Sequence, residues 1–335
     1  MARLIVTNGD SAAANIRSGG VKGRVLEWRD FLHDGPVPAT GSLELVSDAR
    51  ADFISGALGF DLDGVRADFA QRDGVLFAHI AYSEVELWFE HDLFDQLQLI
   101  QLLAFFAQEP ERLGLRLMQA DTYLGALAPA DMTRFEGVAA PVSSLQLELG
   151  RAAWEAFTAS TPEGLAVLGH SSLPELPYLS AALRRLLAEL PAPGSGLSLT
   201  EERALRALAD GPQTIGRLFG IVTQAEEAQF MGDLSFFLRL EALANAPEPL
   251  ISGLPFSLSQ VRPFTPAVPA SPEERTYRDF AAGTVELTKA GQAALAGGFD
   301  HAARNGVDRW IGGTHISPEA LWRFDRAENR LVAPH

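Results

Sequence analysis

Three short apolar segments near the start of the chain each lead directly into a group of polar side chains. These groups are Asn8-Gly9-Asp10-Ser11, then Trp28-Arg29-Asp30 with His33-Asp34, and finally Glu90-His91-Asp92. Apolar runs of this length bounded by polar residues are typical of buried strands. In an open sheet of parallel strands, ligands bind outside the carboxyl ends of the strands. The sequence therefore predicts that the three junctions meet at one binding cleft.

The order of strand-like and helix-like patterns predicts an α/β fold. Residues 1–128 alternate between the two patterns, which favours a parallel or mixed sheet, with residues 75–80 as one further strand. Residues 129–193 have a helical pattern, and a Pro/Gly-rich segment, 191–196, is the best linker. Residues 194–335 give three helices and a strand-like segment in the order of a winged helix, followed by a docking tail.

Composition excludes several classes of function. The net charge of −16 argues against a nucleic-acid partner, whose phosphates attract Lys and Arg. No apolar run is long enough to span a membrane, and the first residues lack a signal-peptide pattern. Cysteine is absent, which excludes disulfides and sulfur-based zinc sites. We therefore expect an acidic cytoplasmic protein with a small-molecule ligand, and a homodimer or a protein partner stays open.

Several motifs resemble one bacterial family. Residues 6–13, the stretch from Trp28 to Pro36, and residues 87–96 resemble bacterial domain-of-unknown-function family 1835. Segments 173–190, 197–201 and 305–315 are similar to the same proteins, so the resemblance covers most of the chain. The resemblance implies membership of the family and carries no specific activity. The chemistry is therefore argued from the residues.

The first junction has two interpretations. At a helix N-terminus, backbone N–H groups attract anions, and Gly9 would let a ligand approach closely. The glycine spacing of a dinucleotide fingerprint or a P-loop is missing. Alternatively, Asp10 or Ser11 only caps the following helix. A carboxylate at Asp10 would repel phosphate, which favours a sugar, ribose or cationic ligand.

The third junction is denser in polar groups. Asp92 is a natural cap for the strongly periodic helix over residues 93–106, and Asp95 with Gln96 could complete a capping arrangement. Capping does not account for His91. This histidine could act as a general base held by Asp92 or Asp30, or as a metal ligand.

The second junction contains an aromatic residue and an arginine that could both contact a ligand. Trp28 could form an aromatic wall, Arg29 could bind a carboxylate or phosphate through two N–H groups, and His33 could add a second acid–base group. Alternatively, Arg29 and Asp30 only form a salt bridge with each other. A metal held by aspartates and a histidine lacks any tight spacing such as His-x-x-x-His, so no metal ligand is assigned and the cofactor stays unknown.

The C-terminal region argues against DNA binding. Residues 200–250 carry eight acidic and four basic side chains, a net charge of −4. The expected recognition helix, 226–244, is apolar on most sides, as in a buried helix. The tail, residues 300–315, either docks the C-terminus or folds over the sheet as a lid that completes the site.

The sequence thus predicts a small-molecule-binding α/β domain, with hydrolase or transferase activity on a nucleotide- or sugar-like polar ligand. In this hypothesis His91 is the acid–base group and Asp92 or Asp30 orients it. The ligand-binding residues are Asn8, Gly9, Asp10, Ser11, Trp28, Arg29, His33, Glu90 and Gln96. The alternative is a non-catalytic regulatory or scaffold protein that uses an acidic winged-helix-like module for protein interaction.

Overall fold

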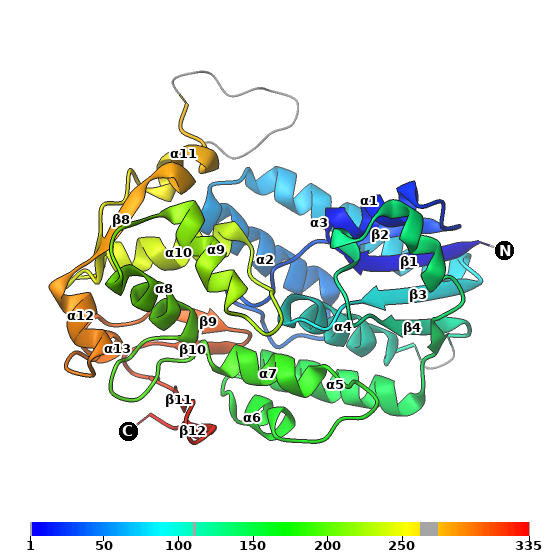
Figure 1. The fold of residues 1–335 in the computed structure, drawn as a ribbon. Helices are drawn as coiled ribbons and strands as arrows, with labels where there is room; N and C mark the ends of the chain where they lie inside the picture. Colours follow the sequence, from blue (N-terminus) through cyan, green and yellow to red (C-terminus); the bar gives the residue numbers. More distant parts are fainter. Residues whose placement is uncertain (1, 110–111, 262–273, 335) are drawn as a thin grey trace.

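The N-terminal part of the chain folds around a five-stranded sheet (Figure 1). The computed structural model describes residues 2–109, 112–261 and 274–334. The strands are β1 (Arg3–Asn8), β2 (Arg24–Trp28), β3 (Glu84–Phe89), β4 (Leu115–Gln119) and β5 (Ala140–Pro141), in the order β2-β1-β3-β4-β5. The first four are parallel and β5 is antiparallel to β4, which confirms the predicted α/β class with a mixed, mostly parallel sheet.

The strand order reverses between β1 and β3. From β1 the chain crosses to β2 on one side, and it then returns to place β3 on the other side of β1. In open α/β sheets, a crevice forms outside the carboxyl ends of the strands where the order reverses. The topology therefore puts a crevice at the ends of β1 and β3.

Helices cover both faces of the sheet. On one face α1 (Asp10–Ser18) and the 3-10 turns η2 (Leu124–Ala126) and η3 (Pro129–Phe135) pack against alternate strand residues such as Ile5 and Trp88. On the other face α4 (Leu93–Phe106) packs against the residues between them, such as Leu4 and Leu87. Burial on both faces explains why residues 4–6 of β1 and residues 87–89 of β3 are consecutive apolar residues.

The segment before β3 is helical, so the predicted strand at residues 75–80 is wrong. After β2 come α2 (Leu43–Leu58), α3 (Leu62–Phe77) and the 3-10 turn η1 (Ala78–Ala81). Phe69, Arg72, Asp73 and Leu76 are buried at helical spacing, so the end of α3 packs one face inward. Within the apolar run, Leu76 and His79 continue that buried face, whereas Phe77 and Ile80 are exposed.

The helical middle shares its core with the sheet. It consists of α5 (Ser144–Thr158), α6 (Glu163–Gly169) and α7 (Leu179–Leu187), and α5 begins with a capping box between Ser143 and Gln146. Phe157 of α5 and Leu183 of α7 belong to the same hydrophobic cluster as strands β1, β3 and β4. These helices therefore brace α4 from the side away from the sheet.

The next region has a core of its own. It contains α8 (Leu199–Ala209), β6 (Gln213–Thr214), α9 (Ile215–Gln224), α10 (Asp233–Ala244), β7 (Ile251–Ser252), η4 (Leu258–Gln260), α11 (Tyr277–Ala282), β8 (Thr284–Leu287), α12 (Lys289–Leu295) and α13 (His301–Asn305). The three strands pair antiparallel in the order β6-β8-β7. Residues 197–299 supply the second hydrophobic core. We refer to this region as the C-terminal module.

The helix α8 begins after Ser198, which forms a capping box with Glu201. The expected start of the helix at residue 226 is wrong. The helix α10 begins at Asp233, seven residues later than expected. The residues before it form a loop whose Phe230 packs with the first core, 5.1 Å from the ring of His33.

The tail returns to the first core. It forms two short hairpins, β9 (Arg309–Ile311) with β10 (Thr314–Ile316), and β11 (Arg323–Asp325) with β12 (Arg330–Val332). At the first turn Gly312 has φ +58°, and a Cβ there would lie 2.0 Å from the carbonyl oxygen of Phe157. Val37 N–H donates to the Gly312 carbonyl at 2.9 Å. These two contacts hold the tail against α5 and against the loop after β2.

No helix among residues 2–109, 112–261 and 274–334 is long and apolar enough to cross a membrane.

Candidate functional site at the ends of β1 and β3

The first and third polar junctions meet at the strand-order reversal. Asn8 ends β1, and its amide Nδ2 donates to Oδ2 of Asp95 at 2.5 Å. The other oxygen of Asp95 accepts from the backbone N–H of Glu90, the residue after β3, at 2.6 Å. One buried aspartate at the start of α4 therefore ties the two strand ends together.

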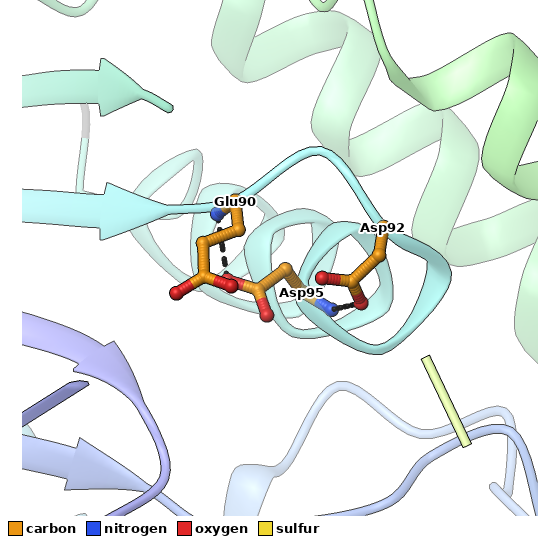
Figure 2. Close-up of side chains that lie close together, drawn as sticks. All are labelled: Glu90, Asp92 and Asp95. Carbon is orange, nitrogen blue, oxygen red and sulfur yellow. Dashed lines mark hydrogen bonds between the residues drawn. The ribbon is translucent and has the colours of Figure 1, made fainter. Parts of the chain in front are cut away.

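Glu90, Asp92 and Asp95 form a compact group, which we call the carboxylate trio. One oxygen from each residue lies within 4.8 Å of the others, and all three side chains are buried (Figure 2). Asp92 Oδ1 accepts from the backbone N–H groups of Phe94 and Asp95, at 2.9 and 3.3 Å. Asp92 thus caps α4, which confirms the capping interpretation of this residue.

Burial makes the carboxylate trio hold protons near neutral pH. Loss of hydration, helped by the neighbouring Asp92 carboxylate, raises the pKa of Glu90 from 4.5 to about 7. Burial also raises the pKa of Asp92 to about 6 and that of Asp95 well above its ordinary value. The trio therefore either shares protons or meets a divalent cation, for which carboxylate oxygens are suitable ligands.

A cavity of about 350 Å³ lies beside the trio. It is lined by residues 8–12, Glu90, Tyr123, Gly125 and Ala126. The first turn of α1 therefore lines the cavity. The N-cap of α1 is Gly9, with φ +35°, and no side chain caps the helix, so the interpretation that Asp10 or Ser11 is only a cap is wrong. A helix start without a side-chain cap keeps its N–H groups for water or a ligand.

Arg29 lies at the rim of this region and neutralises Asp10. Its Nη2 is 2.6 Å from Asp10 Oδ1, and its Nη1 is 3.0 Å from Asp68 Oδ1. The expected salt bridge between Arg29 and Asp30 is therefore wrong. Because the guanidinium compensates the Asp10 charge, the argument that Asp10 repels phosphate no longer holds.

The other residues of the second junction lie away from the cavity beside the trio. Asp30 is buried and receives three hydrogen bonds of 2.9–3.2 Å from Arg50, so its carboxylate orients Arg50 and not His91. Trp28 is a core residue whose Nε1 donates to Gln101 at 2.8 Å. His33 packs on Phe230 and lies 3.8 Å from Asp34. These three residues do not line the cavity beside the trio.

His91 and Gln96 lie near the trio in different roles. The His91 ring sits 5.0 Å from Tyr123 and 5.9 Å from Tyr178, and its buried Nδ1 has no hydrogen-bond partner among the described residues. Gln96 is fully buried and donates from Nε2 to the Glu90 carbonyl at 2.7 Å. Gln96 thus holds the loop that carries the trio.

Sequence reasoning did not assign two residues to the site: it gave Asp95 only a role in capping the helix over residues 93–106, and it did not name Tyr123. Asp95 follows Asp92 by three positions in one helical turn, a spacing that could have identified it. Tyr123 follows β4, and no sequence pattern marks it as a residue of the site. Burial, together with the nearby Asp92 carboxylate, raises the pKa of Tyr123 to about 12, so its phenol stays protonated.

Comparison with known proteins adds no assignment. No protein-family model matches the chain. A search of curated proteins gives no significant match.

Proposed function

We propose that this chain is a small-molecule-binding α/β protein, a hydrolase or transferase that acts on a nucleotide- or sugar-like polar ligand. We also propose that it belongs to family 1835, which its motifs resemble. The ligand binds in the cavity beside the carboxylate trio. The observation that carries the proposal is a buried carboxylate trio at the strand-order reversal, one member of which, Glu90, lines the cavity and has a pKa raised to about 7.

Glu90 takes the acid–base role that the sequence assigned to His91. A general acid or base works best when its pKa lies near the operating pH. Glu90 satisfies this condition, lines the cavity, and is held by a 2.8 Å hydrogen bond from Leu124 N–H to its Oε1. Burial is the main cause of the raised pKa of Glu90 and the charge of Asp92 adds to it, while Asn8 holds Asp95 in place.

The start of α1 provides the ligand-binding side. Backbone N–H groups in the first turn suit hydroxyl or phosphoryl oxygens. A Cβ added at Gly9 would meet no atom within 4 Å, so the space above this residue is open to a ligand. At the rim Arg29 pairs with Asp10 and Asp68, which compensates the Asp10 charge that would otherwise repel a nucleotide phosphate.

A ligand screen followed by one substitution tests the proposal. Nucleotides and sugar phosphates are screened for an increase in melting temperature, which any ligand specific for the native state produces. For a ligand that is turned over, Glu90→Gln should abolish turnover and keep binding, whereas His91→Ala should keep turnover. Glu155→Gln, at an exposed site paired with Arg151, is the matched control. Absence of any stabilising ligand, or full turnover by Glu90→Gln, would refute the proposal.

One observation supports the alternative of a regulatory or scaffold protein. The order α8-β6-α9-α10 with the sheet β6-β8-β7 supports the proposal that this module is winged-helix-like. The helix α10 carries one basic residue, Arg239, against Asp233 and Glu241, which disfavours contact with DNA phosphates, so the partner we propose is a protein or a second copy of the chain. Molecular mass in solution and binding to duplex DNA at low salt distinguish these outcomes. Salt-sensitive DNA binding would contradict the protein-partner version.

A further inference from the structure

The five-stranded sheet ends at β2 on one side. In the strand order β2-β1-β3-β4-β5, only β1 pairs with β2 among the strands that the structure describes (Figure 1). A cavity of about 590 Å³ lies along the other edge of β2, and its lining includes residues 23–27 together with Asp68, Arg72 and Val75 of α3. The N–H and C=O groups at a sheet edge are able to bind a further strand. We call this side of β2 the open edge.

Side chains take the place of a neighbouring strand at the open edge. The Val25 carbonyl accepts from Nη2 of Arg17 at 2.9 Å, and both residues line the cavity, so this carbonyl faces the open edge. Backbone groups alternate in direction along a strand, so those of Glu27 face the same edge. Burial alone would raise the pKa of Glu27, but hydrogen bonds from Arg17 and from its own backbone N–H lower it. One ion pair, Arg17 with Glu27, therefore covers an outward carbonyl and an outward N–H.

This ion pair is a weak cover for the open edge. The Arg17 side chain is 48 % exposed, and ion pairs of exposed side chains contribute little to stability. A strand that bonds to the same backbone groups can therefore displace the pair at little cost.

The two covered groups are complementary to each other. In an antiparallel pair, two residues directly opposite exchange both of their N–H···O=C bonds. If a two-fold axis at Leu26 relates two copies of β2, Val25 lies opposite Glu27 of the second copy. The Val25 carbonyl then accepts from the Glu27 N–H of the second copy, and the axis generates the same bonds again. The second strand therefore satisfies the groups that side chains cover in a single copy.

The charge of Arg17 matches this arrangement. Residues directly opposite each other on paired strands have Cβ atoms about 4.5–5.5 Å apart. Arg17, which contacts Val25, therefore comes within reach of Glu27 of the second copy. The ion pair that covers the open edge can thus exchange for the same pair between two copies.

A second charge match lies at the ends of β2. Arg24 donates to the Tyr82 hydroxyl at 3.2 Å and has no carboxylate partner within the described part of the chain. In the two-fold arrangement Arg24 lies opposite Trp28 of the second copy. Asp68 lies at that end of the strand, 3.0 Å from Arg29, so Asp68 of the second copy is a partner for Arg24.

We propose that the chain forms a homodimer in which two β2 strands pair antiparallel about Leu26 and join the two sheets into one. The contact is the same patch on both copies, as in most dimers with a two-fold axis. It lies on β2 and not on the C-terminal module. This surface is independent of the proposed function at the carboxylate trio.

Sedimentation equilibrium of the full chain tests the dimer. The wild type should be dimeric at about 100 µM, which requires only a micromolar dissociation constant. Arg17→Glu should weaken the dimer at least about tenfold, because it repels Glu27 of both copies. Arg151→Glu makes the same charge change at an exposed pair on α5 and should dimerise as the wild type does. A wild type that stays monomeric, or equal dissociation constants for the two variants, would overturn the proposal.

An introduced cysteine tests the register of the two strands. The chain has no cysteine, so a disulfide-linked dimer must join the introduced thiols. The two Leu26 residues on the axis form a non-hydrogen-bonded pair with Cα atoms about 4.5 Å apart, within the range of about 4.4–6.8 Å that a disulfide needs. Leu26→Cys should therefore cross-link faster than Leu145→Cys, although Leu26 is 7 % exposed and Leu145 is 52 % exposed. Slower or equal cross-linking at residue 26 would refute this register.

A charge exchange gives a further test if Leu26→Cys folds poorly. The double variant Arg17→Glu/Glu27→Arg restores opposite charges across the axis, so it should regain the dimer that Arg17→Glu loses. A double variant as monomeric as Arg17→Glu would contradict the exchange of this ion pair between copies.

Discussion

Replacing Glu90 by glutamine should stabilise the protein at alkaline pH. Glutamine keeps the shape of the side chain and the oxygen that accepts from Leu124 N–H. It removes the carboxyl group whose pKa burial raises from 4.5 to about 7. A pKa change of that size corresponds to about 3 kcal/mol of unfavourable free energy when the folded carboxyl ionises.

The direction in which stability changes with pH follows from the number of protons that the folded and unfolded states bind. Between pH 4.5 and about 7 the unfolded chain has released the Glu90 proton and the folded protein still holds it. The unfolded state therefore binds fewer protons, and the free energy of unfolding falls as the pH rises through this range. Below pH 4.5 the penalty is absent, and above pH 7 it is complete. Glu90→Gln should thus match the wild type in acid and exceed it by up to about 3 kcal/mol in alkali.

Urea unfolding of both proteins below pH 4.5 and above pH 7, in the presence of EDTA, measures this difference. EDTA matters because a bound cation would replace the protons and hide the penalty. Glu155→Gln should show no pH-dependent gain, because that side chain is exposed. Equal pH dependence for wild type and Glu90→Gln, or a less stable variant in alkali, would refute the reasoning about the carboxylate trio.

Three further predictions concern the site and its supports. Without EDTA, a trio that shares protons should give the same melting temperature with and without millimolar Mg²⁺ or Mn²⁺, whereas a rise that is larger in alkali than in acid and absent in Glu90→Gln would show a cation at the trio instead. Arg50→Met should lower the free energy of unfolding by about 3–5 kcal/mol, because it leaves Asp30 buried and unpaired, and urea titration tests this. Gly312→Ala should cost clearly more than Gly137→Ala, which has a similar positive φ but open space around it. Equal melting temperatures of the two glycine variants would show that the contact with Phe157 is unimportant.

The sheet and the long helix could be predicted because their signals are local. The segment 93–106 is apolar at helical spacing and begins after a capping aspartate, and the structure places α4 there with Asp92 as its cap. The strands β1 and β3 are short apolar runs bounded by polar residues. By contrast, residues 75–80 form an apolar run that periodicity alone does not assign to a strand or a helix.

The candidate site could be predicted only in part, because its pairings are long-range. The sequence indicated that Asn8 and Glu90 lie at strand ends, and the strand order brings them together. Nothing near Asp30 in the sequence shows that Arg50 occupies its carboxylate. The same holds for Arg29, whose partner is Asp10 and not its neighbour Asp30.

The course of the main chain has a mechanical consequence. The chain leaves the first core after α7, contacts it through Phe230 within the C-terminal module, and returns to it at Ile311. Both ends of the module are therefore tethered to the same body, as in a domain inserted into another. Truncation near residue 191 would remove the module and also the C-terminal strands that pack on the first core. The apolar side chains which those strands cover would then be exposed to solvent, so the remaining fragment would not be a well-packed smaller protein.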